Sequence, residues 1–310
     1  MNKKKLIVLT GPTAVGKTKL SIALAKKVNG AIISADSMQV YEHMDIGSAK
    51  ITPEEMDGVK HYLVDCISPK DEEGFNVSRF QKMTKEAMAE IYAQGKVPIL
   101  VGGTGFYIQS VVYDIDFTEN DADTSYRELL EELANEKGAE YIHDLLRQVD
   151  PKAAEEIHFN NVKRVIRALE FFQKTGAPIS EHNQTEREKE TPYDLSYFVL
   201  NDDREKLYER INLRVDKMIE DGLVEEVQKL IDMGCTRNMV SMQGLGYKEI
   251  IDYLNGDISL EEAIYIIKRD TRHFAKRQLT WFRREKDVQW VHKSEFANEE
   301  EILQYMLERI

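Results

Sequence analysis

The sequence predicts an α/β protein with a parallel β-sheet, and two observations carry this prediction. In the N-terminal third, short apolar runs rich in β-branched residues alternate with stretches of helical periodicity. The first such run, residues 5–10, leads directly into a phosphate-loop motif, G-x-x-x-x-G-K-[ST], which reads Gly11-Pro12-Thr13-Ala14-Val15-Gly16-Lys17-Thr18. Parallel sheets of this kind bind ligands at the carboxyl ends of their strands, so we expect the site there.

The phosphate loop has the residues that anion binding requires. Gly11 and Gly16 let the backbone curl, so that successive N–H groups converge on an anion at the positive end of the following helix. Lys17 adds a positive charge, and the Thr18 hydroxyl is a suitable Mg²⁺ ligand. A chance match in a glycine turn is the alternative, which the strand before the motif and the helix after it disfavour. The motif alone does not identify the phosphate compound.

The periodicity also predicts the domain organisation. Strands are expected at residues 5–10, 31–34, 61–64, 97–101, 195–200 and 288–291. Helices are expected at residues 17–28, 77–94, 125–136, 140–149, 161–175, 205–221, 224–233, 247–254 and 259–285. No strand-like run occurs between residues 119 and about 192. We therefore expect a helical insertion domain at 119–194, and a P-loop catalytic core formed by 1–118 and the largely helical 195–310.

Composition limits the class of protein. Of the 310 residues 42% are hydrophobic, and no apolar run is long enough to span a bilayer, so we expect a soluble protein without a membrane partner. The lysine-rich start could pass for a signal peptide, but the apolar stretch after it is too short. Cys66 and Cys235 fit no metal spacing, which predicts reduced thiols in a cytosol and no zinc site. We expect a cytoplasmic monomer. The net charge of −13, taken alone, argues against a nucleic-acid partner.

Asp36 is the first candidate for chemistry outside the loop. It follows the strand expected at 31–34, which should lie beside the phosphate-loop strand and direct the carboxylate into the same crevice as Lys17. It could serve as a general base or as a hydrogen-bond acceptor for a nucleophile. A helix N-cap and a Mg²⁺ ligand are the alternatives, and residue type alone leaves cap and base equally open.

The strand at 97–101 ends in Gly102-Gly103-Thr104, where a phosphoryl-transferring enzyme would carry an aspartate for Mg²⁺. The glycines would let a ligand approach the backbone, and Thr104 could donate a hydrogen bond to an oxyanion. An ordinary strand-to-helix turn is the alternative. Combined with the phosphate loop, the missing acid argues against nucleotide hydrolysis and suggests a diphosphate that leaves intact from carbon.

The longest expected helix concentrates positive charge in an acidic protein. Between Lys268 and Lys286, eight basic residues stand against two acidic ones. Lys268, Arg272 and Lys276 are spaced i, i+4, i+8, which predicts a positive ridge with His273 beside it. Contact with the phosphates of a nucleic acid is its natural use, and a solvated helix face is the alternative. The residues expected on the packed side are Ala263, Ile267, Phe274, Gln278 and Trp281.

Two smaller basic clusters accompany this helix. Lys163, Arg164 and Arg167 lie on one helix of the expected insertion and could form an opposing wall. Arg210 and Arg214 lie one turn apart and could reach a diphosphate, with solvated arginines as the equally open alternative.

The phosphate loop and six further segments, taken in order over nearly the whole chain, resemble the tRNA dimethylallyltransferases. The six are Asp36-Ser37-Met38-Gln39-Val40-Tyr41, Asp45-Ile46-Gly47-Ser48-Ala49-Lys50, Val101-Gly102-Gly103-Thr104-Gly105, Lys163-Arg164-Val165-Ile166-Arg167-Ala168-Leu169-Glu170, Gly246-Tyr247-Lys248-Glu249 and Lys276-Arg277-Gln278-Leu279-Thr280-Trp281. The most specific are the segments that begin at Asp36 and Lys276. Eukaryotic members often carry a C-terminal zinc finger whose cysteines are absent here, so the resemblance is to the bacterial type.

This resemblance implies transfer of a dimethylallyl group from dimethylallyl diphosphate to the exocyclic amine of the adenosine 3′ to the anticodon, with Mg²⁺ as cofactor. It implies that the phosphate loop, Gly11 to Thr18, holds the diphosphate together with Arg214, and that Thr18 is the residue on Mg²⁺. It assigns catalysis to Asp36 as base, with Thr104 and Lys17. The implied partner is the anticodon stem-loop, contacted by Asp36, Ser37, Met38, Gln39, Thr104, Arg127, Lys163, Arg164, Val165, Ile166, Arg167, Gln243, Gly244, Leu245, Gly246, Tyr247, Lys248, Lys276, Arg277, Gln278, Leu279, Thr280, Trp281, Phe282 and Arg283.

Three other functions share some of these features. An isopentenyltransferase that acts on free adenine nucleotides would not need the basic helix. A P-loop kinase for a small molecule would need an acid after Val101. An RNA-binding NTPase would change RNA affinity with nucleotide and leave the RNA mass unaltered.

Overall fold

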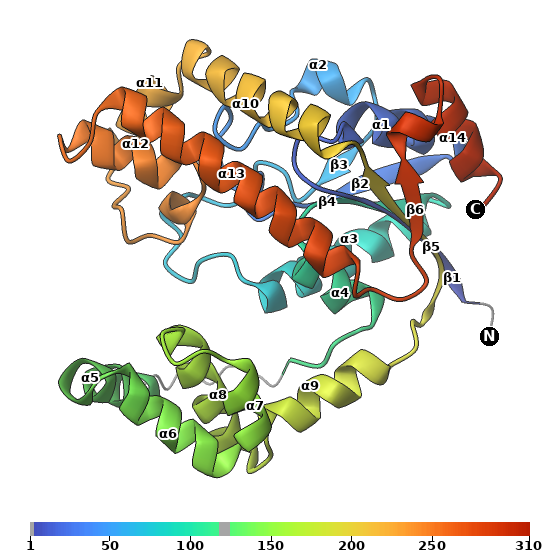
Figure 1. Cartoon of the computed structure of the whole chain (residues 1–310). Coiled ribbons are helices and arrows are strands. Elements are labelled where there is room, and N and C mark those ends of the chain that lie inside the picture. Colours follow the sequence, from blue (N-terminus) through green and yellow to red (C-terminus); the bar gives the residue numbers. More distant parts are fainter. Residues whose placement is uncertain (1–2, 118–124) are drawn as a thin grey trace. The chain divides into compact units, whose positions relative to one another are not determined.

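The computed structural model describes residues 3–117 and 125–310, which form two compact units (Figure 1). One unit, here called the sheet unit, combines Met1–Val112 with Pro192–Ile310, and the other, the helical unit, is Tyr113–Thr191. The boundary expected after residue 118 lies outside the described residues. The return to the sheet unit begins at Pro192, close to the expected residue 195.

A six-stranded parallel sheet organises the sheet unit, in the order β3-β2-β4-β1-β5-β6. This confirms the expected α/β class with a parallel sheet. Its strands are β1 (Lys4–Thr10), β2 (Gly30–Ala35), β3 (His61–Tyr62), β4 (Val97–Gly102), β5 (Tyr193–Asn201) and β6 (Gln289–His292). The central strand β1 aligns Leu9 with Val101 of β4 and with Phe198 of β5.

One expectation about this order is wrong. Strand β2, which leads to Asp36, does not lie beside the phosphate-loop strand β1, because β4 lies between them. Both strands still end at the same edge of the sheet, since all strands are parallel. Asp36 therefore reaches the phosphate-loop side of the sheet from two strands away.

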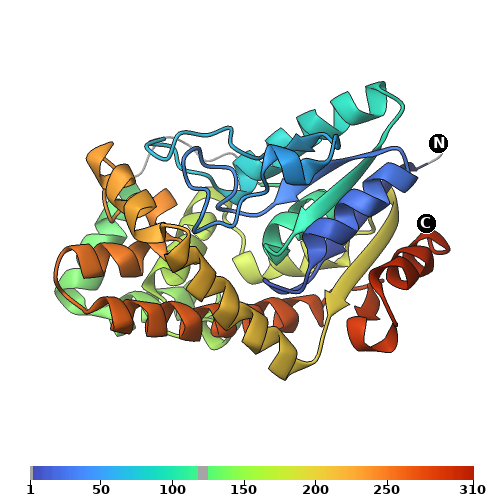
Figure 2. The same cartoon turned by 90° about the horizontal axis from the view of Figure 1, so that it is seen from above.

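Helices cover both faces of this sheet (Figures 1 and 2). The connections β1–α1–β2 and β3–α3–β4 run in opposite directions across the sheet, so right-handed crossovers place α1 and α3 on opposite faces. The helices of the unit are α1 (Lys17–Lys27), α2 (Pro53–Met56), α3 (Val77–Ala93), α4 (Gly105–Val112), α10 (Arg204–Glu220), α11 (Leu223–Asp232), α12 (Tyr247–Leu254), α13 (Leu260–Phe282) and α14 (Glu299–Leu307), with 3₁₀ turns η1 (Ser241–Gln243) and η2 (Lys293–Glu295).

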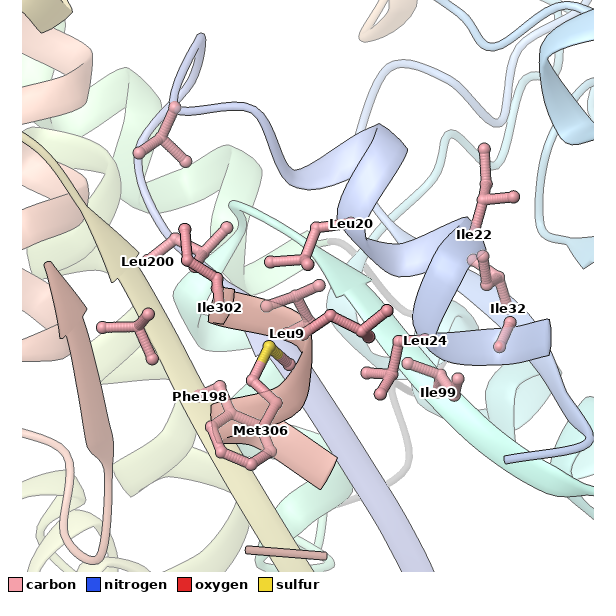
Figure 3. Packing of buried hydrophobic residues seen from close by; sticks show 14 of the residues in the cluster. Leu9, Leu20, Ile22, Leu24, Ile32, Ile99, Phe198, Leu200, Ile302 and Met306 are labelled. Atoms are coloured by element: carbon pink, nitrogen blue, oxygen red, sulfur yellow. The ribbon is translucent and has the colours of Figure 1, made fainter. Parts of the chain in front are cut away.

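Helices α1 and α14 seal the core on one face of the sheet (Figure 3). Leu24 of α1 and Met306 of α14 meet Leu9 and Phe198 of the strands, and all four side chains are fully buried. Burying a side chain of this size contributes about 2 kcal/mol to stability. Helix α14 was not predicted from the sequence, although it completes this core.

The described residues of the helical unit, 113–117 and 125–191, form five helices around a core of their own. These are α5 (Ser125–Lys137), α6 (Ala139–Val149), α7 (Pro151–Glu156), α8 (Val162–Thr175) and α9 (Ile179–Glu188), of which α7 and α9 were not predicted. Ile142, Leu146 and Val165 are fully buried in its core. The buried Asp150 carboxylate accepts hydrogen bonds from the backbone N–H groups of Ala153 and Ser180, at 2.9 Å each, and so connects α7 to α9. Within residues 3–117 and 125–310, no helix is both long and apolar enough to cross a membrane.

Gly102, the last residue of β4, has no room for a side chain. A Cβ built there would lie 2.2 Å from the carbonyl oxygen of Ala35 and 2.4 Å from its carbonyl carbon, both backbone atoms of β2. Backbone atoms cannot move aside as a flexible side chain can. The two strand ends that lead to the site therefore approach each other only because residue 102 is glycine.

We expect Gly102→Ala to lower the free energy of unfolding by about 3 kcal/mol, because the methyl group forces β2 and β4 apart. Gly95→Ala is the matched control, since Gly95 has a positive φ of 66° but no described atom lies within 4 Å of the place that its methyl group would take. The strain of alanine at this positive φ should lower the free energy of unfolding by about 1 kcal/mol. Urea unfolding of both variants measures the difference, and equal costs would contradict the packing argument.

Candidate active site

The sheet unit holds a cavity of 420 Å³ at the carboxyl ends of its strands. Its floor is the phosphate loop, with the ends of β2 and β4 on one side and residues of α10 and α13 on the other. The lining residues are Thr13, Ala14, Gly16, Lys17, Thr18, Ser34, Asp36, Gln39, Ala49, Val101, Gly102, Gly103, Arg210, Leu213, Arg214, Phe274 and Gln278. The cavity thus collects most of the residues expected at the diphosphate, together with Asp36.

The phosphate loop has the backbone conformation of an anion cradle. Gly16 caps α1 with φ 97°, and Ala14 also has a positive φ, 61°. The N-cap residue Gly16 has no side chain to cap the first turn of α1, and this turn, which lies wholly in the described part of the chain, contains no acidic residue. Its N–H groups therefore keep their partial positive charge for an anion in the cavity. Gly11 has φ 145°, and a Cβ there would lie 2.4 Å from the carbonyl oxygen of Leu200.

Lys17 is held inside the loop. Its Nζ donates to the carbonyl oxygens of Gly11, at 3.0 Å, and Pro12, at 2.9 Å. Burial lowers the pKa of Lys17 to about 8, the positive charge of Arg214 contributes to this lowering, and the Asp36 carboxylate opposes the shift. An anion in the cavity would remove this penalty, because it would compensate the buried ammonium charge.

Arg214 is the second cation of the cavity. Burial lowers its pKa, and the Asp36 carboxylate acts in the opposite direction. Among the residues that the structure describes, the guanidinium has no hydrogen bond or ion pair. Lys17 and Arg214 thus share one carboxylate between them. Arg210 also lines the cavity but is paired with Asp202, so the remaining two cations stand against one anion and leave a positive cavity, which suits a multiply charged anion such as a diphosphate.

Asp36 is half-buried and caps a turn rather than a helix. Its Oδ1 accepts from the backbone N–H groups of Met38, at 2.8 Å, and Gln39, at 3.4 Å, and no helix starts there. The helix N-cap considered from the sequence is therefore wrong. The turn fixes one carboxylate oxygen, and the side chain still lines the cavity, where its other oxygen can accept a proton or a hydrogen bond.

Arg210 is not a free cation for a diphosphate, because its guanidinium already has partners. Its Nε donates to the carbonyl oxygen of Ala14 at 3.0 Å, and its guanidinium forms a 2.8 Å ion pair with Asp202. Gln278 holds the same loop from α13, since its Oε1 accepts from the Thr13 N–H at 2.9 Å. Arg210 and Gln278 therefore support the phosphate loop from outside.

The glycines after β4 make room for helix α13, while the backbone of Gly102 and Gly103 still lines the cavity, as expected for a close approach of a ligand. A Cβ at Gly103 would lie 2.2 Å from Nε2 of Gln278, and one at Gly105 would lie 2.2 Å from the Trp281 ring. Both neighbours belong to α13. Thr104, between these glycines, donates its N–H to the carbonyl oxygen of Ala35 at 3.2 Å, and it is not among the residues that line the cavity.

The donors for a divalent cation are few. In the described part of the chain, no three residues of the types His, Cys, Asp and Glu gather into a metal site. The cavity offers the Thr18 hydroxyl and the Asp36 carboxylate. This set fits Mg²⁺ of the kind that takes most of its ligands from phosphate oxygens and water, and it does not fit a cation that needs an all-protein site.

The positive ridge of α13 is partly neutralised. Lys268 forms an ion pair of 2.5 Å with Asp216, and Arg272 donates to Oδ1 of Asn212 at 2.6 Å, so both engage α10. Lys276, Arg277 and Arg283 are exposed. A second, open hollow of 390 Å³ lies along this exposed part and is lined by His273, Lys276, Arg277, Thr280, Trp281 and Arg284.

Two of the motif segments, 45–50 and 246–249, meet at Glu226 of α11. Its carboxylate accepts from the consecutive backbone N–H groups of Asp45, Ile46 and Gly47, at 2.7–3.1 Å, and from the Tyr247 hydroxyl at 2.9 Å. The burial of Tyr247 and the negative charge of Glu226 raise the pKa of that hydroxyl. This carboxylate clamp fixes the loop that leads to Ala49 on the cavity wall.

The segment after Asp36 also meets the segment after η1. A Cβ at Gly244 would lie 2.6 Å from the terminal methyl group of Met38, so the Met38 side chain packs directly against the backbone of Gly244. Gln39 lines the cavity and donates from Nε2 to the carbonyl oxygen of Ala49 at 3.2 Å. Ser37, Leu245 and Lys248 are half-buried, and Gln243 is exposed.

The helical unit presents only part of its expected RNA-binding set. Lys163 and Arg164 are exposed on α8, and Arg167 is half-buried. Arg127 is occupied by a bidentate pair with the buried Glu170, at 3.0 and 3.2 Å.

Several side chains expected on the tRNA path are buried within their own units. They are Val165, Ile166, Tyr247, Gln278 and Phe282. Their side chains pack the units and do not form an exposed surface. Leu279 and Trp281 are half-buried, and Thr280 is exposed.

Sequence reasoning missed the supporting residues of the site. No motif marks Glu226, Asp202 or Leu213, and each resembles any other residue of a surface helix or loop. Phe274 and Gln278 were expected on the packed side of α13, and both line the cavity. The helical spacing of the α13 residues predicted that these two side chains face inward, but it did not predict the contact between Gln278 and the phosphate loop.

Comparison with known proteins agrees with these features. A sequence model of the IPP transferase family matches residues 39–285. A relative named tRNA dimethylallyltransferase, from Lachnoclostridium phytofermentans, is 65% identical over 302 residues, which is 97% of this chain and 96% of the relative.

Two solved structures are similar over 99% of this chain. The tRNA isopentenylpyrophosphate transferase of Bacillus halodurans is 46% identical, with a TM-score of 0.74 and 95% of that chain covered. A eukaryotic dimethylallyltransferase acting on tRNA is 29% identical, with a TM-score of 0.82 and 80% of that chain covered. The phosphate loop, the cavity at the strand ends and these matches lead to one conclusion: the chain belongs to the IPP transferase family.

Proposed function

We propose that this protein transfers the dimethylallyl group of dimethylallyl diphosphate to the exocyclic amine of the adenosine 3′ to the anticodon of a tRNA, and releases diphosphate. The observation that carries this proposal is that Lys17, Arg214 and Asp36 share one cavity. The cavity combines an excess of positive charge, which suits a departing diphosphate, with one carboxylate, which suits a nucleophile that must lose a proton. The family membership and the relatives' names support the same reaction.

The phosphate loop would stabilise the leaving group. As the carbon–oxygen bond breaks, negative charge grows on the diphosphate oxygens, and fixed N–H groups, Lys17 and Arg214 stabilise that charge without reorganising. The Thr13 N–H already bonds Gln278, so the loop N–H groups left for the diphosphate begin at Ala14. Thr18 would hold Mg²⁺, which would neutralise part of the diphosphate charge.

Asp36 would act on the acceptor. An aromatic amine is a weak nucleophile, so it gains from a carboxylate that orients it and takes its proton as the carbon–nitrogen bond forms. The turn at Met38 and Gln39 fixes one carboxylate oxygen and so the direction of the other. The adenine must leave its stack to reach the cavity, as in other enzymes that modify a base.

The exposed part of α13 would contact the RNA. Lys276, Arg277 and Arg283 offer positive charge, and the hollow beside them offers the Trp281 ring. The exposed Lys163 and Arg164 of the helical unit are further candidates for phosphate contact. Because tRNA is modified in the cytoplasm of a bacterium, we place the reaction there.

We expect the purified protein to add one dimethylallyl group to an anticodon stem-loop with adenosine at this position, and Asp36→Asn to lower kcat at least about 100-fold. Asparagine keeps the Oδ1 acceptor of the turn but cannot take the proton. RNA affinity should stay near wild type, and diphosphate affinity should not fall, because the change removes a negative charge from the cavity. Mass spectrometry of the RNA nucleosides gives the rate.

The acceptor decides between the related functions. A stem-loop with guanosine at this position and free adenosine monophosphate should both remain unmodified. Modification of the free nucleotide alone, or transfer of phosphate from ATP to a small molecule, would refute the proposal. Unchanged turnover of Asp36→Asn would leave Asp36 with the turn as its only role.

The pKa of Lys17 predicts how diphosphate affinity depends on pH. In the free protein this pKa is about 8, and a bound anion raises it. Between the two values the complex holds more protons than the free protein, so the affinity should fall as pH rises above 8, by up to about tenfold per pH unit. Titration calorimetry with inorganic diphosphate measures this, and Lys17→Met controls for the titration of diphosphate itself. Identical pH profiles of the two proteins would contradict the prediction.

The exposed cations of α13 predict the salt dependence of RNA binding. Lys276→Ala combined with Arg277→Ala should weaken stem-loop binding and reduce the slope of log K against log salt by up to about two. Lys27→Ala with Lys82→Ala is the matched control, because it removes the same charge from exposed positions on α1 and α3. Equal slopes for the two double variants would mean that this part of α13 is only a solvated face.

A further inference from the structure

Gln278 is a buried glutamine with both ends of its amide engaged. Its side chain is on α13, and the residue is 6% exposed. Oε1 accepts from the backbone N–H of Thr13 in the phosphate loop, and Nε2 donates to the carbonyl oxygen of Gly103, both at 2.9 Å. The two partners fix the orientation of the amide, because only its oxygen can accept and only its nitrogen can donate.

This amide joins three segments that lie far apart in the sequence. It bonds the phosphate loop after β1 and the turn after β4, and it belongs to α13. The close approach is possible because residue 103 is glycine: a Cβ there would lie 2.2 Å from Nε2 of Gln278. Lys276 and Arg277, the residues immediately before Gln278, are exposed.

The phosphate loop needs such support because its backbone is strained. Ala14, the neighbour of Thr13, has a φ of 61°, which costs a residue with a side chain about 1 kcal/mol. The Val15 N–H reaches the Pro12 carbonyl oxygen only at 3.4 Å, so the loop holds itself weakly there. Two hydrogen bonds from outside the loop stabilise this strained conformation. One joins Gln278 to Thr13, and the other joins Arg210 to Ala14.

We infer that Gln278 is a positioning residue for the diphosphate site: it holds the phosphate loop in its binding conformation. It does so from α13, the helix whose exposed cations are proposed to contact the RNA. It touches no reacting atom. Its amide sets the direction of the loop N–H groups through Thr13, and it sets the distance between the loop and the end of β4 through Gly103. The inference rests on the proposal that the loop binds the diphosphate.

Two substitutions test this role by direct binding of inorganic diphosphate in titration calorimetry. Gln278→Leu removes both bonds at similar volume and should lower diphosphate affinity about tenfold. Gln278→Glu should lower diphosphate affinity at pH 8. A carboxylate can still accept from the Thr13 N–H, but its second oxygen repels the Gly103 carbonyl oxygen. At pH 5.5 a buried, protonated glutamic acid can donate to that oxygen, so the affinity should return toward wild type measured at the same pH.

The matched control is Gln81→Leu. Gln81 is also buried, and its Nε2 donates to the carbonyl oxygen of Ser110 at 2.7 Å, between α3 and α4. This variant loses a buried glutamine bond of the same kind and should unfold at a lower temperature, as Gln278→Leu does, while diphosphate affinity stays at the wild-type value. Thermal unfolding of each variant shows that binding is measured on folded protein.

Wild-type diphosphate affinity in Gln278→Leu, or an affinity of Gln278→Glu that does not recover at pH 5.5, would overturn the inference. Gln278 would then only attach α13 to the sheet. These outcomes are separate from failure of the proposed function, since a wild-type protein that binds diphosphate but modifies no RNA refutes only the reaction. Binding of diphosphate does not depend on the acceptor.

Discussion

The burial of Lys17 and Arg214 beside the single carboxylate of Asp36 is the constraint on which the rest of the site depends. Burial lowers the pKa values of both cations, and the positive charge of Arg214 lowers the pKa of Lys17 further, which reflects the cost of holding them there. An empty site must therefore be held open by other parts of the fold. The sheet provides this rigidity, because the strands that lead to the loop and to Asp36 are fixed in register on either side of β4. A bound anion compensates the two buried charges, so this unfavourable free energy contributes to anion affinity.

The helices after the sheet act as walls of the cavity as well as an outer surface. Helix α13 presents Phe274 and Gln278 to the cavity and exposes Lys276 and Arg277 to solvent. Helix α10 presents Arg214 to the cavity, while its Arg210 supports Ala14. One helix thus serves both the small anion and the proposed RNA, which gives a physical reason for glycine at 103 and 105: each lets α13 approach the end of β4.

The features that the sequence could predict are those set by local chemistry. Apolar runs and glycines predicted the strands and the phosphate loop, and helical spacing predicted the packed side of α13. The ridge of cations was predicted only in part, since Lys268 and Arg272 contact α10. Contacts between distant segments could not be predicted, because no local pattern encodes them. Strand order is one case: β4 separates β2 from β1. Arg210 is another, since its spacing to Arg214 suggested a shared ligand, while the pair with Asp202 makes it a support.

The balance of groups in the cavity also bears on the reaction that we propose. An allylic carbon can lose its leaving group readily, so stabilising the departing diphosphate is the greater requirement. Lys17, Arg214 and the N–H groups at the start of α1 are placed to do this. The acceptor amine needs only an oriented base, for which one carboxylate suffices. A phosphoryl transfer would need the reverse, with acids at the strand ends to hold a cation on the phosphates. Strand β4 is followed instead by Gly103 and Gly105, where the space of a side chain is filled by Gln278 and Trp281, so these two positions supply no acid.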